Sequence, residues 1–231
     1  VLTPLLQDAG IAVHHVPLRG KWNPVDLRAL ARLLRDKRAD IVHTHSFGGN
    51  ISGILAAAMA RVPVRLGQVH VRQHHWYGKT ELRRKKQRLE EFVVHSLFTD
   101  KVIFPSKAAM EYFHAHCPIP ERKLHLLHNG IRLPEAITPQ ERAVAAKNLR
   151  ERFKIPSECR ILGFVGRLTG GKGVEFTFSF MDRLRRAGLR HCLVIVGSSG
   201  DARTDEELKE QAAALGSGLV HFAGSQADPY P

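Results

Sequence analysis

The sequence predicts an α/β protein with two doubly wound, parallel-sheet units that follow one another along the chain. Short apolar runs alternate with amphipathic stretches over most of the 231 residues, which is typical of parallel strands covered by helices. One segment, residues 131–140, contains two prolines and no clear period, so it is predicted to be a linker. We therefore expect an N-terminal unit over residues 1–132, a linker with a surface helix over 133–158, and a C-terminal unit over 159–231.

The elements of the first unit follow from the spacing of its apolar residues. Residues 1–10 have the pattern of the end of a helix. Strands are expected after them at 12–18, 40–45, 64–70, 101–106 and 123–130, with helices between them at about 24–38, 47–61, 80–98 and 107–116. In the first of these helices, leucines recur at helical spacing and Pro24 suits the first turn.

The second unit is predicted from the same alternation. A charged helix over 141–153 precedes it. Strands are expected at 160–166, 191–197 and 219–224, and helices at about 174–187 and 205–215. Both ends of the chain have the pattern of truncations, so both units are expected to be incomplete, and the first is expected to lack its first strands.

Composition limits the classes of protein. Hydrophobic residues make up 43% and charged residues 25% of the chain, as in ordinary globular proteins. The sequence contains no run of 18 apolar residues, so no membrane-spanning helix is predicted. Its first residues lack the basic region of a signal peptide. Three isolated cysteines favour a reducing cytosol over a disulfide or zinc framework. The net charge of +13 predicts attraction to a polyanion: nucleic acid, anionic lipid or a phosphorylated small molecule.

A glycine-rich segment, GRLTGGKG at 166–173, directly follows the apolar run ILGFV. Glycines allow close approach of the backbone to an anion, and the helix expected next presents free N–H groups. The spacing resembles a Walker A loop. However, Gly173 stands where a Mg²⁺-binding Ser or Thr is required, and no apolar strand ends in a Walker B Asp. We interpret the segment as a phosphate site. A plain turn would explain the glycines but not Arg167 and Lys172.

Several segments in collinear order resemble glycosyltransferase family 4. The pattern G-R-L-x-x-x-K-G at 166–173 resembles the start of the family's C-terminal domain. ADIVHTHSFGGNISGILAAAMARVPV resembles its D-h-h-H-x-H strand and following helix, and VIFPSKAAMEYF resembles a later strand and helix. LHNGI resembles the end of the N-terminal domain, and CLVIVGSSGDARTDEELKEQAAALGSGLVHFAG resembles the l-h-I-h-G-x-G segment. Together these matches cover almost the whole chain.

The resemblance implies the GT-B architecture, two Rossmann-like domains with the active site in the cleft between them. It implies a retaining transferase that takes its sugar from a nucleotide diphosphate donor, without a cofactor or an obligatory metal. Gly166, Arg167, Lys172 and Gly173 would bind the donor diphosphate. Arg167 and Lys172 would also act as catalytic residues, because fixed cations neutralise the charge that builds on the leaving group, a task that Mg²⁺ otherwise performs.

Histidines gather at two expected strand ends. The resemblance implies that His70, at the carboxyl edge of a strand, contacts the donor sugar as a catalytic residue; a purely structural role is the alternative. His45 is a weaker candidate for the acceptor side, together with Gly48 and Asn50 just after it. His43 and His45 share one face of a strand and could hold a metal. No acidic third ligand lies nearby, so no metal site is predicted.

The helix expected at 80–98 begins with a dense group of cations. Its candidates for membrane contact are Trp76, Arg83, Arg84, Lys85, Lys86 and Arg88. Cations beside aromatic and apolar residues suit an anionic membrane surface. The alternative is a solvated basic face on a helix whose apolar side, with Leu82, Leu89 and Leu97, packs on the sheet. A nucleic-acid partner is not expected, because no recognised nucleic-acid module is present.

The leading hypothesis is part of a hexosyl- or related glycosyltransferase of polysaccharide or lipopolysaccharide synthesis. It would use a nucleotide-sugar donor and a glycan or lipid-linked acceptor, in the cytoplasm or at the inner face of the cytoplasmic membrane. The family's N-terminal Gly-rich loop and its E-x7-E segment are absent from these residues. We therefore expect no transferase activity from the 231 residues alone. Two alternatives stay open: a GT-B nucleotide-sugar 2-epimerase, and a non-enzymatic basic module that binds membrane or nucleic acid.

Overall fold

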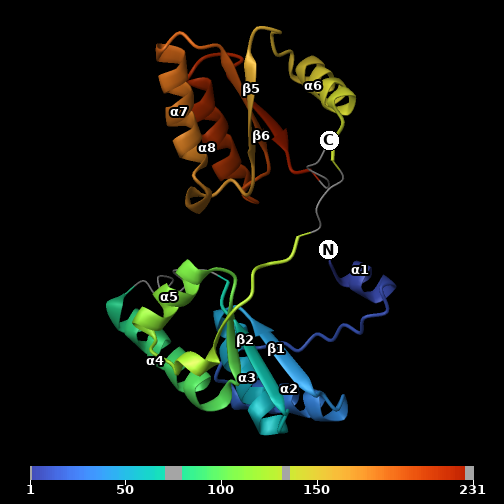
Figure 1. Cartoon of the computed structure of the whole chain (residues 1–231), viewed down its shortest axis with the longest axis vertical. Helices are drawn as coiled ribbons and strands as arrows, with labels where there is room; N and C mark the ends of the chain where they lie inside the picture. Colours follow the sequence, from blue (N-terminus) through green and yellow to red (C-terminus); the bar gives the residue numbers. More distant parts are fainter. Residues whose placement is uncertain (1, 71–79, 132–135, 227–231) are drawn as a thin grey trace. The chain divides into compact units, whose positions relative to one another are not determined.

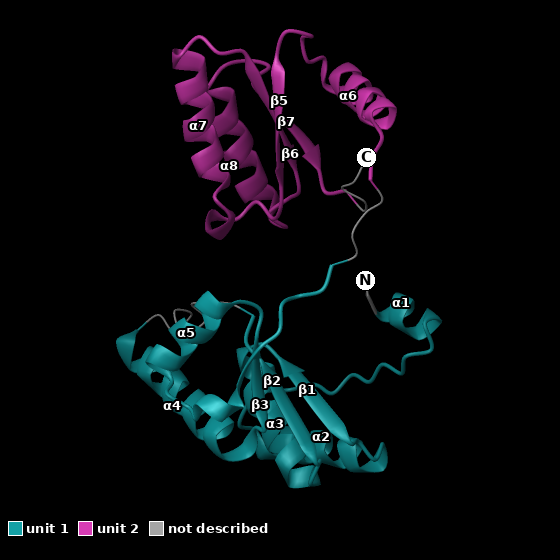
Figure 2. Cartoon of the chain, in the orientation of Figure 1, with its two compact units in different colours: residues 1–132 teal, residues 133–231 magenta. Residues whose placement is uncertain are grey.

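The computed structural model describes residues 2–70, 80–131 and 136–226. The chain divides into two compact units, residues 1–132 and 133–231, which Figure 2 shows in different colours. Each unit holds one parallel sheet with helices packed on it. The predicted α/β class with two parallel sheets is therefore confirmed.

The first unit has four parallel strands, side by side in chain order: β1 (Ile41–His45), β2 (Val64–Gln68), β3 (Lys101–Phe104) and β4 (Leu124–Leu126). Its helices are α1 (Leu2–Asp8), α2 (Pro24–Asp36), α3 (Phe47–Ala60), α4 (Glu81–Phe98) and α5 (Lys107–His116), with a short 3-10 turn, η2, at Glu121–Lys123. Figure 1 shows α2 and α3 together beside β1 and β2. The helices keep close to their predicted bounds, but β4 is shorter than the predicted strand at 123–130.

The strand predicted at 12–18 is wrong, because this segment forms no strand in the structure. Two features of the sequence explain the error. Val13 and Val16, the residues of the segment that are partly covered, are three positions apart rather than two, and Pro17 has no N–H to donate to a neighbouring strand. The segment leads instead into α2, where the Arg19 guanidinium donates to the Asp26 carboxylate over 3.0 and 3.1 Å.

Glycines let α3 and α4 pack closely on the sheet. A Cβ atom on Gly53 of α3 would lie 2.5 Å from Thr44 Cγ2 of β1, and one on Gly67 of β2 would lie 2.8 Å from His95 Cε1 of α4. Both distances are shorter than a carbon contact allows, so each position requires glycine. These contacts hold α3 close to β1 and α4 close to β2, the two strands at whose carboxyl ends His45 and His70 lie.

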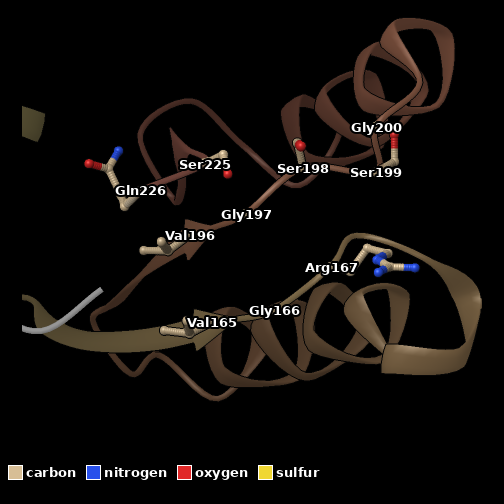
Figure 3. A pocket seen from close by; sticks show the side chains of 10 residues that line it. All are labelled: Val165, Gly166, Arg167, Val196, Gly197, Ser198, Ser199, Gly200, Ser225 and Gln226. Atoms are coloured by element: carbon tan, nitrogen blue, oxygen red, sulfur yellow. The ribbon is translucent and has the colours of Figure 1, made fainter. Parts of the chain in front are cut away.

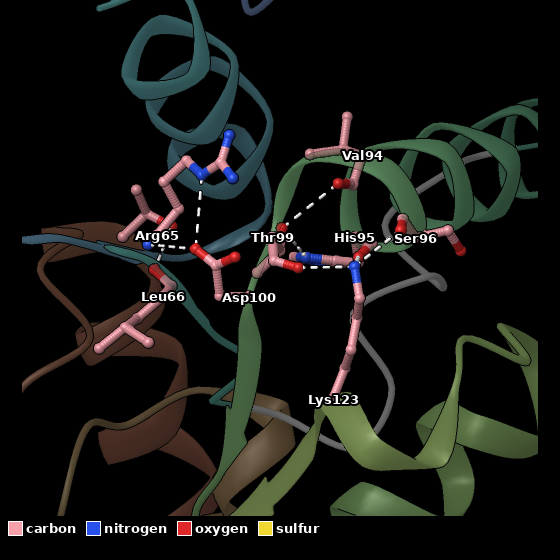
Figure 4. Close-up of polar contacts among 9 residues, drawn as sticks. Arg65, Leu66, Val94, His95, Ser96, Thr99, Asp100 and Lys123 are labelled. Carbon is pink, nitrogen blue, oxygen red and sulfur yellow. Dashed lines mark hydrogen bonds and ion pairs between the residues drawn. The ribbon is translucent and has the colours of Figure 1, made fainter. Parts of the chain in front are cut away.

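The end of α4 is held by one lysine from η2, the turn directly before β4 (Figure 4). Lys123 Nζ donates to the carbonyl oxygens of His95, Ser96 and Thr99 over 3.1, 2.7 and 2.7 Å. The last carbonyls of a helix have no partner within it and carry its negative dipole end, so a cation there is stabilising. Burial lowers the pKa of Lys123 from its ordinary value, and the charge of nearby Arg122 adds to this effect.

Lys123→Met should lower the free energy of unfolding of the first unit by about 2 kcal/mol, because it removes three charge-assisted bonds from half-buried carbonyls. Urea unfolding followed by tryptophan fluorescence measures this, since both tryptophans, Trp22 and Trp76, belong to this unit. The control is Lys101→Met. Lys101 is exposed and donates to a single carbonyl, that of Arg122, so a change within about 0.5 kcal/mol is expected. Equal losses in the two variants would contradict the assigned role of Lys123.

The second unit has three parallel strands in chain order: β5 (Arg160–Val165), β6 (His191–Val196) and β7 (Val220–Gly224). Its helices are α6 (Pro139–Phe153), α7 (Val174–Arg186) and α8 (Ala202–Ala213), with a 3-10 turn, η3, at Gly170–Lys172. One sheet face, with Leu193 and Ile195, packs with the apolar residues of α7 and α8. The other face, with Cys192 and Val194, packs beside α6.

The helix predicted at 141–153 begins two residues earlier, at Pro139. Thr138 and Glu141 form a reciprocal capping box, in which the Thr138 hydroxyl accepts from the Glu141 N–H and the Glu141 carboxylate accepts from the Thr138 N–H. The bonds from Thr138 lower the pKa of Glu141. This box and the proline at the first helical position are start signals that the sequence carries.

Candidate functional site

A cavity of about 520 Å³ opens at the carboxyl edge of the second unit's sheet (Figure 3). Its lining residues come from the ends of β5, β6 and β7 and from the loops that follow: Val165–Arg167, Val196–Gly200, Ser225 and Gln226. Ligands of open α/β sheets bind at this edge. Gly166 and Arg167, both predicted as binding residues from the sequence, belong to the lining.

Two glycines make the floor of this cavity. Gly197 has φ +137°, and a Cβ atom on it would lie 1.9 Å from the Gly166 carbonyl oxygen. The two loops are pinned together by backbone bonds, from Gly166 N to the Val196 carbonyl (3.0 Å) and from Leu168 N to the Ser198 carbonyl (3.1 Å). A side chain at position 197 would fill the space where the backbones meet, so glycine is required there.

The predicted phosphate segment runs from this floor to the start of α7. Gly173 has φ +76° and joins η3 to the helix. Val174 and Glu175 are the first two residues of α7, so their N–H groups have no acceptor within the helix. Free N–H groups at the positive end of a helix dipole attract an anion. The local structure thus has the features that the sequence predicted for a phosphate site.

Arg167 and Lys172 are both exposed, and neither makes an ion pair in the part of the chain that the structure describes. Arg167 lines the cavity, whereas Lys172 and Gly173 do not. Lys172 is the last residue of η3, two residues before the free N–H groups at the start of α7. The segment therefore offers two positions for an anion: the cavity beside Arg167, and the helix start beside Lys172.

The loop after β6 supplies site residues that the sequence analysis did not assign to binding. Ser198, Ser199 and Gly200 line the cavity opposite Arg167. Hydrogen bonds to the start of α8 hold this loop in place. The Asp205 carboxylate accepts from the Ser199 N–H over 2.7 Å, and the Ser199 hydroxyl donates to the carbonyl of Asp201, the N-cap of α8, over 2.7 Å. A signal was available, because the loop follows a buried parallel strand whose end must lie beside that of β5.

In the first unit, the histidines meet at the ends of β1 and β2. His45 Nδ1 and His70 Nε2 lie 2.8 Å apart, so one ring donates a hydrogen bond to the other. The His43 and His45 ring centroids lie 4.3 Å apart. Partial burial, and then the proximity of His43 and His70, lower the pKa of His45 below its ordinary value of 6.5. His70 therefore has a polar partner, and the hydrogen bond between the facing nitrogens requires at least one ring to be neutral near pH 7.

The two weaker acceptor-side candidates differ in position. Asn50 is only 1% exposed. Its amide donates to the Gln68 carbonyl over 3.1 Å and its oxygen accepts from the Thr44 hydroxyl over 2.8 Å, so it joins α3 to β1 and β2. Gly48 is partly exposed, at the start of α3. Ser46, between β1 and α3, has φ +67°, a strained conformation for a residue other than glycine.

The predicted membrane-contact cations lie on α4, while Trp76 lies outside the described residues. Arg84 and Arg88 form ion pairs with Glu81 at 3.7 and 2.9 Å. Arg83, Lys85 and Lys86 are exposed. None of the described helices is long and apolar enough to span a bilayer. Among the described residues, no group of three or more His, Cys, Asp or Glu side chains has the geometry of a metal site.

Comparison with known proteins decides the family. The sequence profile of Glycosyltransferase Family 4 matches residues 4–134, more than half of the chain. The chain belongs to glycosyltransferase family 4. A search of curated protein sequences finds no significant match.

Solved structures show that this family 4 chain has the GT-B fold. HepE from Anabaena, solved with UDP and glucose, is 17% identical with a TM-score of 0.74, over 98% of this chain and 60% of that one. A glycosyltransferase from Rickettsia africae is 20% identical with a TM-score of 0.74, over 98% and 58%. The lipopolysaccharide outer core galactosyltransferase WaaB is 15% identical with a TM-score of 0.60, over 95% and 54%. The chain thus spans about three fifths or less of the length of these proteins.

Proposed function

We propose that this chain belongs to a glycosyltransferase that takes its sugar from a nucleotide diphosphate donor, and that the second unit binds the diphosphate. The observation that carries the proposal is the edge of the β5–β7 sheet. There the close approach of Gly166 and Gly197, the first N–H groups of α7, and two cations that have no ion partner among the described residues lie at one cavity and the helix start beside it. Such an arrangement fits a ligand with closely spaced negative charges.

The role of each group follows from the chemistry of transfer. When a sugar leaves a nucleotide diphosphate, negative charge builds on the phosphate oxygens. Fixed cations lower the barrier to departure because they need no reorganisation during the reaction. Arg167 at the cavity and Lys172 at the helix start supply this charge, so our proposal needs no metal ion. Two phosphates in sequence would match the two anion positions of the segment.

His70 is proposed to contact the donor sugar, and its partner His45 holds the ring in position. An imidazole that donates or accepts through one nitrogen keeps a defined tautomer at the other. The bond between His45 Nδ1 and His70 Nε2 therefore leaves His70 Nδ1 without a partner among the residues that the structure describes. Transfer with retention to a glycan or lipid-linked acceptor, in the cytoplasm or at the membrane, is part of the proposal. The nucleotide-sugar donor in this proposal is supported by HepE, which was solved with UDP and glucose, and the choice of a glycan or lipid-linked acceptor by the name of WaaB, a lipopolysaccharide outer core galactosyltransferase.

A radiolabelled donor assay on the protein that contains this chain tests the proposal. UDP-, GDP- and ADP-sugars are incubated with the membrane and polysaccharide fractions of the source cells. Product is separated from free nucleotide, and the anomeric configuration of the product is read by NMR. We expect label to pass from one nucleotide class to a glycan or lipid, with release of the nucleoside diphosphate and retained configuration. A sugar nucleotide isomerised at C2 without transfer would instead establish an epimerase, and no binding of any nucleotide sugar would overturn the proposal.

A further inference from the structure

An exposed aromatic ring lies next to the proposed diphosphate site. Phe176 is the third residue of α7 and is 75% exposed, more than any other Phe, Tyr or Trp side chain in the described part of the chain. The core side of α7 is formed by Val174, Phe178 and Met181, which pack in the interior of the second unit. The packing of the helix therefore does not require an aromatic residue at position 176, and the ring forgoes the free energy that burial would provide.

The direction of this side chain follows from the geometry of a helix. Helical side chains lean toward the N-terminal end, so each covers the turn that precedes it. The turn before Phe176 is the junction of η3 and α7, where Lys172 and the first N–H groups of the helix lie. A Cβ atom on Gly173 would lie 4.0 Å from the Phe176 Cβ atom. The ring thus flanks the anion position at the helix start.

The order of groups in the donor places its sugar on this side. A nucleotide sugar is linear, with the nucleoside at one end, two phosphates in the middle and the sugar at the other end. The 520 Å³ cavity beside Arg167 has the size of a small-molecule site and can take the nucleoside, whereas Lys172 and Gly173 lie outside its lining. With one phosphate beside Arg167 and the next beside Lys172, the sugar follows at the start of α7, where Phe176 lies.

We propose that Phe176 binds the donor sugar by packing its ring against the C–H face of a pyranose. A pyranose carries hydroxyl groups around its rim and weakly positive C–H groups on its faces, and the face of an aromatic ring is negative. Stacking therefore removes apolar surface from water while the hydroxyl groups keep their hydration. This inference rests on the proposed function, and it adds a residue that distinguishes the sugar nucleotide from the free nucleotide.

Isothermal titration calorimetry on the protein that contains this chain tests the inference with pairs of ligands. The pairs are UDP with UDP-glucose, GDP with GDP-mannose, and ADP with ADP-glucose, and the pair that binds is followed in the variants. Phe176→Ala should weaken binding of the sugar nucleotide roughly 10-fold and leave binding of the free nucleotide within about twofold. Phe176→Tyr keeps the ring face, so its affinity for the sugar nucleotide should stay within about twofold of the unchanged protein.

The matched control is Phe180→Ala, which removes the same ring one turn later from an exposed position of α7. Both affinities should stay within about twofold, and circular dichroism checks that the variants fold. An unchanged affinity of Phe176→Ala for the sugar nucleotide would overturn this inference alone. So would equal losses for the free nucleotide, which would assign the ring to the nucleoside or the phosphates, or an equal loss in Phe180→Ala. Failure of the unchanged protein to bind any of these nucleotides would overturn the proposed function as well.

Discussion

Gly197→Ala should lower the free energy of unfolding of the second unit by about 4 kcal/mol, the sum of backbone strain and overpacking at one atom. The added Cβ would lie 1.9 Å from the Gly166 carbonyl oxygen and 2.9 Å from its carbon. This steric clash is relieved only if β5 and β6 separate at their carboxyl ends. That movement breaks the bonds from Gly166 N to the Val196 carbonyl and from Leu168 N to the Ser198 carbonyl. The cavity loses its floor in the same step.

Hydrogen exchange of the β5 and β6 amides measures this effect, because the second unit contains no tryptophan. Protection should fall in these strands while that of β1 and β2 in the first unit is retained. Gly171→Ala is the control in the same segment: a Cβ there meets nothing within 4 Å, and its effect should stay within about 0.5 kcal/mol. Unchanged protection in Gly197→Ala would show that the loops do not approach as closely as the structure has them.

Arg167→Ala and Lys172→Ala should each weaken the binding of a nucleoside diphosphate by about 10- to 100-fold without loss of stability. A hydrogen bond to a charged group contributes about 1.5–3 kcal/mol, and both side chains are exposed, so removing either should leave the fold intact. Isothermal titration calorimetry with UDP, GDP and ADP measures the loss. Arg167→Lys should recover only part of the affinity, because an ammonium cannot make the two parallel bonds of a guanidinium.

Arg183→Ala provides the comparison for these variants. Arg183 is an exposed cation in the last turn of α7, the helix whose first turn follows Lys172, so it lies at the opposite dipole end from the proposed phosphates. Binding within about twofold of the unchanged protein is expected, since a remote exposed charge is screened. If Arg183→Ala weakens binding as much as Arg167→Ala, the net charge of the chain, rather than the site at β5, attracts the nucleotide.

Most of the fold could be predicted from local sequence. Apolar spacing and caps, such as Thr138 with Glu141, act over a few residues. They therefore predicted the helices and the observed strands with bounds that are correct to within a few positions. The glycine segment at 166–173 likewise predicted a strand, an anion-binding turn and a helix. Local patterns failed at 12–18, where an apolar run suggested a strand, because pairing depends on a neighbour that sequence spacing does not reveal.

The sequence by itself thus determined the class of fold, the order of its elements and the residues at the start of α7. Only the tertiary structure showed that Gly197 lies against Gly166, that Ser198 and Ser199 share a cavity with Arg167, and that His45 meets His70.

The tertiary structure also decided which side of α4 faces outward. The expectation that its apolar side packs on the sheet is wrong, because that side is exposed: Leu82, Leu89 and Leu97. Periodicity shows which residues share a helix face, but the face that turns inward depends on partners such as Lys21 and Trp22, which lie 69 and 68 residues away from Glu90 in the sequence.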